Sequence, residues 1–434
     1  MILRNPNFCM APWTHTYLSP QTERRICCAS REPAQSFKQY IDTESGSGIY
    51  SPITLHDHWN SEHMKSVRRR MMAGETLPEC EVCNTKILNT DVYRSYFNNL
   101  FKHRYDFAMA NTLPDGTTTM QPVSWDYRFS NLCNFKCRMC GDMLSSSWEV
   151  EQKQHNMVDL TKSNNAWMLP NIRKEIEDFQ STQVEQEFAC AVEEHRVEEI
   201  YWVGGEPLMY EQHWKYMPRI IELGDGPKVY ARYNSNLSRV NYKGLNLYND
   251  ILSKLRDWQM CASLDGTGAL GEYIRSGLNY SQWKTNFQQG VDIQTHRRQM
   301  RIDFTLTLPG MFEIENIIDL AKEMDVDILA KVVFSFDPNI ILSPLALPKP
   351  LLHTWIDDIC SNVKIQGAMR DILLQLKNRK TFEEQWPDRY KQGLIQGKKR
   401  ILQLEQIRND KFTMRDILQP RAEILDWWNN INVL

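Results

Sequence analysis

Apolar residues in the middle of the chain alternate between short β-type runs and longer stretches with helical spacing. Six runs rich in β-branched and aromatic residues have the length and composition of strands. They are residues 123–129, 199–204, 228–234, 260–265, 301–308 and 331–336. Residues 184–195 and 314–324 place apolar side chains three and four positions apart, which predicts amphipathic helices. Strands that alternate with helices predict an α/β fold of parallel β/α units, as an open sheet or a barrel.

The regions on either side of this pattern differ from it. The N-terminal region holds two candidate helices, one with the basic stretch Lys65–Arg70 and one that begins after Thr90. The polar segment 111–122 predicts a turn or linker, and the proline-rich segment 343–350 ends the β/α pattern. Helical spacing returns beyond it. The chain is therefore predicted to have three parts, which are residues 1–110, 121–338 and 339–434.

Composition narrows the class of protein. Of the 434 residues, 42% are apolar, which is enough for a sizeable core. The 51 Lys and Arg nearly balance the 54 Asp and Glu, and a net charge of −3 gives no electrostatic case for binding nucleic acid or an anionic membrane. The sequence contains no run of about 18 apolar residues that would predict a membrane span. Its first residues are too polar for a secretory signal, so we expect a cytoplasmic protein.

Clustered cysteines change this picture. The chain has 11 cysteines, an odd number that does not suggest a disulfide framework. Cys133, Cys137 and Cys140 lie in the segment NLCNFKCRMCG, directly after a predicted strand. Three thiolates on a short loop can hold an iron–sulfur cluster or a zinc ion and leave one position open to another ligand. These residues alone do not distinguish an iron–sulfur cluster from a zinc ion.

Small, polar and charged residues lie at or after the ends of the next three predicted strands. They are Gly204, Gly205, Glu206, Ser235, Asn236, Ser263 and Arg275. Two glycines let the backbone approach a ligand closely, a carboxylate can pair with an ammonium group, and an arginine is a natural partner for a carboxylate. Each residue alone would be ordinary turn chemistry. Together they occupy the C-terminal strand ends, where parallel β/α folds place their ligand sites.

The two motifs together resemble the radical S-adenosylmethionine (SAM) enzymes. The spacing of Cys133, Cys137 and Cys140 matches the defining motif of that family, and Gly204–Pro207 matches its GGEP segment. The resemblance implies that the three cysteines ligate three irons of a 4Fe–4S cluster, whose fourth iron binds the amino and carboxylate groups of SAM. It also implies a partial (β/α)6 TIM-like barrel over residues 121–338.

The same resemblance assigns roles around SAM. It implies that Glu206 binds the methionyl ammonium group, and that Ser263 and Arg275 lie near the ribose and the carboxylate. Ser235–Asn236 correspond to a family segment that commonly reads Thr-Asn-Gly, from which this chain departs. Met139 stands where many members carry an aromatic residue, and its backbone is expected to meet the adenine.

A second group of cysteines lies in the first 100 residues. It consists of Cys9, Cys27, Cys28, Cys80 and Cys83. This group resembles the auxiliary-cluster module called SPASM, or twitch in its single-cluster form, although that module usually follows the barrel. The resemblance implies a second 4Fe–4S cluster on Cys9, Cys27, Cys80 and Cys83, with the spacing favouring Cys27 over Cys28. A four-cysteine zinc site has the same CxxC signature, so structural zinc is the alternative.

These resemblances imply an oxidoreductase-like radical SAM enzyme. With an auxiliary cluster to accept an electron, we expect oxidative modification of a peptide or protein, and a flavodoxin or ferredoxin as reducing partner. Dehydrogenation or rearrangement of a small molecule such as an aminocyclitol is the alternative reaction. A zinc-binding interaction protein is the alternative of another class. No residue of the sequence identifies the substrate.

Overall fold

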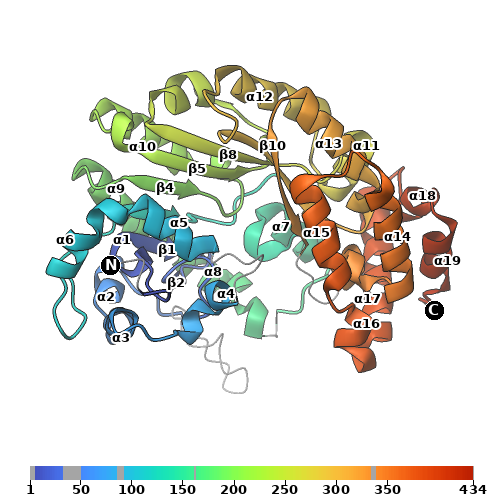
Figure 1. Cartoon of the computed structure of the whole chain (residues 1–434), viewed down its shortest axis with the longest axis horizontal. Coiled ribbons are helices and arrows are strands. Elements are labelled where there is room, and N and C mark those ends of the chain that lie inside the picture. The colour runs from blue at the N-terminus through green and yellow to red at the C-terminus, as the bar shows by residue number, and fades with distance from the viewer. Residues whose placement is uncertain (1–4, 33–49, 86–91, 161–162, 334–338, 434) are drawn as a thin grey trace. The chain divides into compact units, whose positions relative to one another are not determined.

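The computed structural model describes residues 5–32, 50–85, 92–160, 163–333 and 339–433. The chain, whose helices and strands are labelled in Figure 1, divides into two compact units, each made of several segments. The first unit consists of residues 1–132, 149–233 and 242–258, and the second of residues 133–148, 234–241 and 259–434. Parallel strands and helices occur in both units, which confirms the predicted α/β class.

Five strands form the sheet of the first unit. Their order is β5 (Tyr230–Ser235), β4 (Glu199–Trp202), β3 (Ser124–Tyr127), β1 (His15–Leu18) and β2 (Arg24–Arg25). Neighbouring strands are parallel except β1 and β2, which are antiparallel. The predicted strands at 123–129, 199–204 and 228–234 are therefore present. The sequence did not predict β1, which pairs with β3 from within the N-terminal region.

Aromatic side chains fill one face of this sheet. Trp125 and Trp202 both contact Phe188 of α9 (Glu185–Glu193), with ring centroids 5.5 and 6.1 Å apart. On the same face, His213 of α10 (Glu211–Glu222) lies 4.9 Å from Trp202. The helix α9 confirms the prediction for residues 184–195. This face is a packed apolar core, as expected for a parallel sheet covered by helices.

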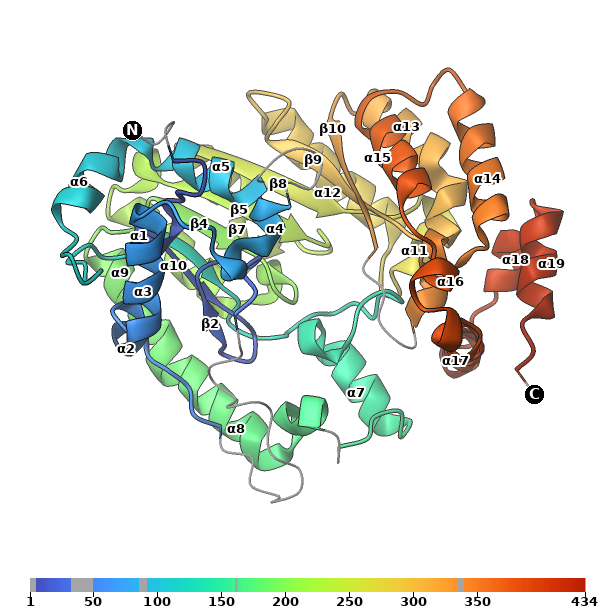
Figure 2. The same ribbon diagram turned by 60° about the horizontal axis from the view of Figure 1, so that its bottom comes forward.

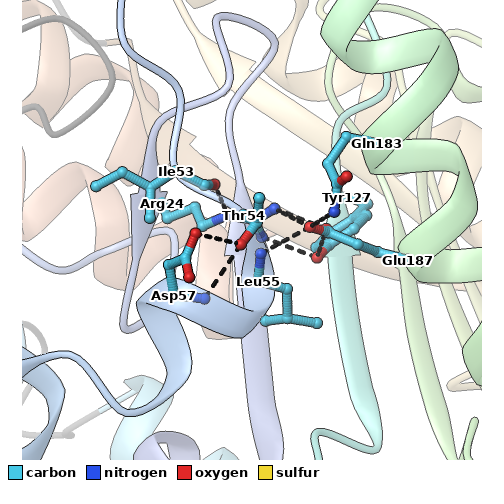
Figure 3. Close-up of polar contacts among 8 residues, drawn as sticks. All are labelled: Arg24, Ile53, Thr54, Leu55, Asp57, Tyr127, Gln183 and Glu187. Atoms are coloured by element: carbon cyan, nitrogen blue, oxygen red, sulfur yellow. Dashed lines mark hydrogen bonds and ion pairs between the residues drawn. The ribbon is translucent and has the colours of Figure 1, made fainter.

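A buried ion pair joins the N-terminal segment to the sheet. Arg24 has a fully buried side chain, and its Nη2 lies 2.6 Å from a carboxylate oxygen of Glu187 on α9. Its Nη1 donates to the hydroxyl of Tyr127 on β3, and its Nε donates to the carbonyl of Ile53 (Figure 3). The backbone N–H of Leu55 donates to the same Glu187 carboxylate. These partners satisfy both charges, and removing one partner of such a pair costs about 3–5 kcal/mol.

Helices of the N-terminal region form a second small core. The helices α3 (Glu62–Met72) and α5 (Val92–Leu100) are the two that the sequence predicted. Trp13, Val67 and Phe97 are each 2% exposed or less in this core. The first unit also contains α1 (Ala11–Thr14), α2 (Leu55–Trp59), α4 (Glu81–Asn84), α6 (Tyr105–Ala110), most of α7 (Ser146–Gln154) and α8 (Pro170–Phe179).

Three parallel strands run through the second unit, in the order β10 (Asp327–Val332), β9 (Met300–Leu306) and β8 (Asp257–Ser263). The prediction for the last strand was wrong in position, because β10 begins four residues before residue 331. Pairing of Ile328 with Ile302 and of Ala330 with Phe304 sets this register. Residues 334–336 of that prediction lie outside the described residues.

Helices make up the rest of the second unit. The helix α13 (Ile314–Glu323) confirms the prediction for residues 314–324. Helices also follow residue 348 as predicted, and Figure 2 draws them in orange and red. They are α14 (Lys349–Ser361), α15 (Gly367–Asn378), α16 (Phe382–Gln385), α17 (Pro387–Arg408), α18 (Met414–Leu418) and α19 (Ala422–Asn430). None of the helices in the described ranges is long and apolar enough to cross a membrane. The (β/α)6 barrel and the three predicted parts stay predictions.

Candidate functional site

The loop Cys133–Cys140 belongs to the second unit, where backbone hydrogen bonds fix its path. The N–H groups of Lys136 and Arg138 donate to the carbonyls of Ser276 and Ile274, over 2.7 and 2.8 Å. These acceptors lie directly after or at the end of α11 (Gly268–Ile274). The loop is therefore held at its middle, between its cysteines.

Two side chains direct N–H groups at the sulfur atoms of this loop. The Nη1 of Arg275 lies 3.9 Å from the Sγ of Cys137, and the Nδ2 of Asn236 lies 4.0 Å from the Sγ of Cys133. Burial raises the pKa of the Cys137 thiol to about 12, and the Arg275 guanidinium acts in the opposite direction. Donors and a positive charge favour the thiolate form, which is the form that binds metal. The donor set thus fits a group that takes thiolate ligands.

Asp265 fixes the position of Arg275. The Nε of Arg275 lies 2.7 Å from Oδ2 of Asp265, and the N–H of Thr305 donates to Oδ1 over 2.8 Å. The sequence assigned Arg275 to the cofactor carboxylate, and the structure gives its guanidinium this buried protein carboxylate as well. Asp265 is a site residue that sequence reasoning missed. Its place in the segment Ser-Leu-Asp-Gly, two residues after Ser263, was the available signal.

Close packing explains the two glycines of the GGEP segment, which belongs to the first unit. Gly204 has φ +127°, in the region that favours glycine. A Cβ at Gly205 would lie only 2.2 Å from the carbonyl oxygen of Leu132, and the Gly205 N–H donates to the hydroxyl of Tyr210. The N–H of Glu206 donates to that same Leu132 carbonyl over 2.7 Å. The segment is thus packed against the residue that precedes Cys133.

The side chain of Glu206 is buried, with 1% of the residue exposed. Its Oε1 accepts a hydrogen bond from the N–H of Leu208 and so caps the short turn Pro207–Met209. A carboxylate held in this way has a fixed orientation. The structure does not test its assignment to the SAM ammonium group, which stays a prediction.

The other residues predicted to contact SAM differ in their burial and hydrogen bonds. Ser235 is buried and accepts a hydrogen bond from the N–H of Leu237, whereas Asn236 also donates to Asn134 over 2.9 Å. Ser263 is half-buried in the last position of β8, and Met139 is half-buried within the cysteine loop. The structure thus brings Asn236 and Arg275 to the cysteine sulfurs and leaves the other assignments as predictions.

Four of the five N-terminal cysteines line one small pocket in the first unit. They are Cys9, Cys27, Cys80 and Cys83. Cys28 is not among the residues that line it, although it follows Cys27 in the chain. Cys80 and Cys83 lie three residues apart, at the start of α4, and this spacing places both side chains on one side of the turn.

Buried polar contacts position the loop that carries Cys27. The Glu32 carboxylate accepts hydrogen bonds from the Ile26 N–H over 2.6 Å and the Ser30 hydroxyl over 2.5 Å. Its other oxygen lies 2.5 Å from Nε2 of His63 on α3. One carboxylate therefore ties both ends of the cysteine loop to a helix of the N-terminal core.

Burial disfavours negative charge at three of these cysteines. It raises the pKa of Cys9 and Cys27, and that of Cys80 to about 11, while Arg94 acts in the opposite direction on Cys9 and Cys80. Buried thiols that face one pocket need a cation to ionise, which fits a metal or iron–sulfur group. Within the described ranges, no three Cys, His, Asp or Glu side chains are close enough to hold a single metal ion.

Comparisons with known proteins do not assign this chain to a family. No protein-family model matches the chain, and no curated protein sequence matches it. Among solved structures, the crystal structure of SuiB from Streptococcus suis is similar over 66% of this chain and 62% of that chain. The sequence identity is 13% and the TM-score is 0.35. The chain thus covers less than two thirds of the SuiB chain, and a likeness of this size assigns neither a fold nor an activity.

Proposed function

We propose that this chain is a radical SAM enzyme. The observation that carries the proposal is the loop of Cys133, Cys137 and Cys140 with two N–H donors, from Asn236 and Arg275, directed at its sulfurs. Hydrogen bonds to cluster sulfurs are a known means of setting a reduction potential. The tightly packed glycines of the GGEP segment agree with this assignment.

The three cysteines would hold a 4Fe–4S cluster and leave its fourth iron to SAM. When bound, this pair supplies a 5′-deoxyadenosyl radical for hydrogen abstraction, after an electron arrives from a donor such as flavodoxin or ferredoxin. Asn236 and Arg275 would stabilise the added negative charge of the reduced state. Asp265 keeps the Arg275 guanidinium in place for that role.

Oxidative modification of a peptide or protein is the proposed reaction. The substrate would lose a hydrogen atom from a C–H bond, which would end in 5′-deoxyadenosine. A second cluster would supply the acceptor for the one electron that a substrate radical must lose, together with one proton to solvent, to become a closed-shell product. Cys9, Cys27, Cys80 and Cys83 would hold that second cluster, since they share one pocket.

Metal content and SAM cleavage test the proposal. Protein purified without oxygen is expected to be brown and to hold about eight irons per chain if both clusters are present. Cys133→Ala, Cys137→Ala and Cys140→Ala should each remove one cluster and abolish formation of 5′-deoxyadenosine. Cys190→Ala, at an exposed cysteine on α9, is the matched control and should change neither.

Two results would contradict the proposal. One is a colourless protein that holds stoichiometric zinc at both sites, which would favour a zinc-binding interaction protein. The other is full SAM cleavage by any of the three cysteine variants. The double variant Cys80→Ala/Cys83→Ala, once shown to be folded, tests the role of the second cluster separately from SAM cleavage. It should form 5′-deoxyadenosine but no oxidised product.

A further inference from the structure

The second face of the sheet in the first unit is polar, unlike the aromatic face. Residues that alternate along β1, β3, β4 and β5 bring ionisable and hydroxyl side chains to this face. They are His15, Tyr17, Ser124, Asp126, Glu199, Tyr201 and Arg232. Strands of a parallel sheet are usually apolar on both faces. A polar row inside such a sheet is costly without partners, which indicates a function.

The carboxylates of this face already have partners. Glu199 is fully buried and accepts hydrogen bonds from the hydroxyls of Ser124 and Tyr96 and from the Nε of Arg232, the last over 2.9 Å. Asp126 is also fully buried and lies 3.1 Å from the Nε of Arg128. The oxygens of these carboxylates are therefore already engaged within the protein.

Arg232 has unused donors. Its guanidinium carbon lies 4.1 Å from the ring centre of Tyr96 and 4.2 Å from that of Tyr201, so two aromatic rings hold the plane of the group. Only its Nε forms a hydrogen bond, and its two Nη groups have no partner among the residues that the structure describes. Its side chain is 16% exposed. A planar guanidinium with both Nη groups free is suited to a carboxylate, which it binds through two parallel hydrogen bonds.

The charges of this face limit the charge of the ligand. Arg128 and Arg232 are paired with Asp126 and Glu199, so a dianion such as phosphate would meet more repulsion there than a carboxylate with its single negative charge. The face lies near the N-terminal cysteines. Cys28 interacts with the charges of Asp126 and Arg232, and Tyr93, its hydrogen-bond partner, lines the four-cysteine pocket.

We propose that Arg232 binds the carboxylate of an acidic side chain, aspartate or glutamate, in the peptide substrate. This inference rests on the proposed function in treating the peptide as a substrate. Binding of the carboxylate by Arg232 does not itself depend on any chemical step. It places the recognised group on the sheet face that adjoins the pocket of Cys9, Cys27, Cys80 and Cys83. Arg232 would then set which residue of a peptide is presented for modification.

Calorimetric titration of the anaerobically purified full chain with three small probes tests the proposal. The probes are N-acetylglutamic acid amide, the corresponding glutamine amide and N-acetylalanine. The glutamic acid amide should bind at least about tenfold more tightly than its neutral glutamine counterpart. N-acetylalanine, which carries a terminal carboxylate, should bind more weakly than the glutamic acid amide.

Variants assign the binding to one side chain. Arg232→Gln should weaken binding of the glutamic acid amide at least about tenfold, and Arg232→Lys should weaken it less because the charge remains. Should Arg232→Gln fail to fold, Arg232→Lys carries the test, since it retains a cation for Glu199. Arg219→Gln, at an exposed arginine on α10, is the control and should bind as the wild type.

Equal binding of the acidic and neutral probes would overturn the proposal, as would absence of binding by any probe or unchanged affinity in folded Arg232→Gln and Arg232→Lys proteins. Tighter, Arg232-dependent binding of N-acetylalanine would overturn the assignment to a side chain and point to a chain terminus. Iron content and 5′-deoxyadenosine formation are measured in the same preparation. Their failure would reject the proposed function and leave the binding result intact.

Discussion

At the scale of single residues, the donors near the cysteine sulfurs have the most direct consequence. A reduced cluster carries more negative charge than an oxidised one, so an N–H group directed at a sulfur stabilises the reduced form. Asn236 makes such a contact with Cys133 at 4.0 Å. Its side chain can be replaced by an apolar one of similar size.

Asn236→Leu should make the reduction potential of the proposed cluster on Cys133, Cys137 and Cys140 more negative. Loss of about 1.4 kcal/mol would shift a one-electron potential by about 60 mV. A redox titration followed by electron paramagnetic resonance measures the shift. Asn249→Leu, at an exposed asparagine, serves as control, and an unchanged potential in the Asn236 variant would argue against the contact.

Gly205 gives a second prediction at this scale, based on sterics. Gly205→Ala places a Cβ 2.2 Å from the Leu132 carbonyl oxygen, so the backbone before Cys133 must move. We expect a loss of stability of about 1–3 kcal/mol and lower iron content. Gly141→Ala is the control, because no atom lies within 4 Å of an added Cβ there. Thermal unfolding and iron analysis compare the two, and equal behaviour would contradict the prediction.

At the scale of elements, the link between α3 and the Cys27 loop depends on one ion pair. The hydrogen bond with the buried Glu32 carboxylate raises the pKa of His63. A histidine whose pKa is higher in the folded protein adds stability below its unfolded value near 6.5. That stability disappears as the pH rises through the higher folded pKa.

His63→Gln should therefore lower stability by about 1 kcal/mol at pH 5.5 and by much less at pH 9. Thermal unfolding of wild type and variant at both pH values measures the two differences. His155→Gln, at an exposed histidine, controls for general effects of removing an imidazole. A difference that grows with pH would show that the sign of this linkage is wrong.

The sequence predicted individual helices and strands better than it predicted which of them pair or pack together. Long runs such as 184–195 and 314–324 carry a full helical period, and α9 and α13 follow them closely. The strand β1 has only four residues, too few for a clear period, so its pairing with β2 and β3 defines it. Arg232 escaped notice for a related reason. Its proposed role depends on residues of distant strands, and such contacts leave no local pattern.

At the scale of the second unit as a whole, the C-terminal helices support the cysteine loop. Arg138 is 1% exposed, stacks on Tyr273 at 3.6 Å and pairs with Asp410, just after α17. From α17, Arg400 and Arg408 lie 4.9 and 4.8 Å from the ring of Trp148. The indole of Trp148 in turn donates to the carbonyl of Cys137 over 2.7 Å. The C-terminal extension therefore acts on the loop directly.

Asp410→Asn should weaken this support by removing the charge that neutralises buried Arg138. A loss of about 2–4 kcal/mol and reduced iron on the loop cysteines are expected. Asp388→Asn, at an exposed position in the first turn of α17, is the matched control. Urea unfolding and iron content measure both effects, and a variant as stable as the control would contradict this role.

The ion pair of Arg24 has a consequence for the order in which the protein can form during synthesis. Its partner Glu187 lies 163 residues later in the chain, and the ribosome adds about 5–20 residues per second. The N-terminal segment therefore spends many seconds outside the ribosome before its anchor exists. Until then, the Cys27 loop is held by contacts within the N-terminal region, such as the pair of Glu32 and His63. Insertion of the proposed second cluster is therefore expected to be complete only after α9 has emerged.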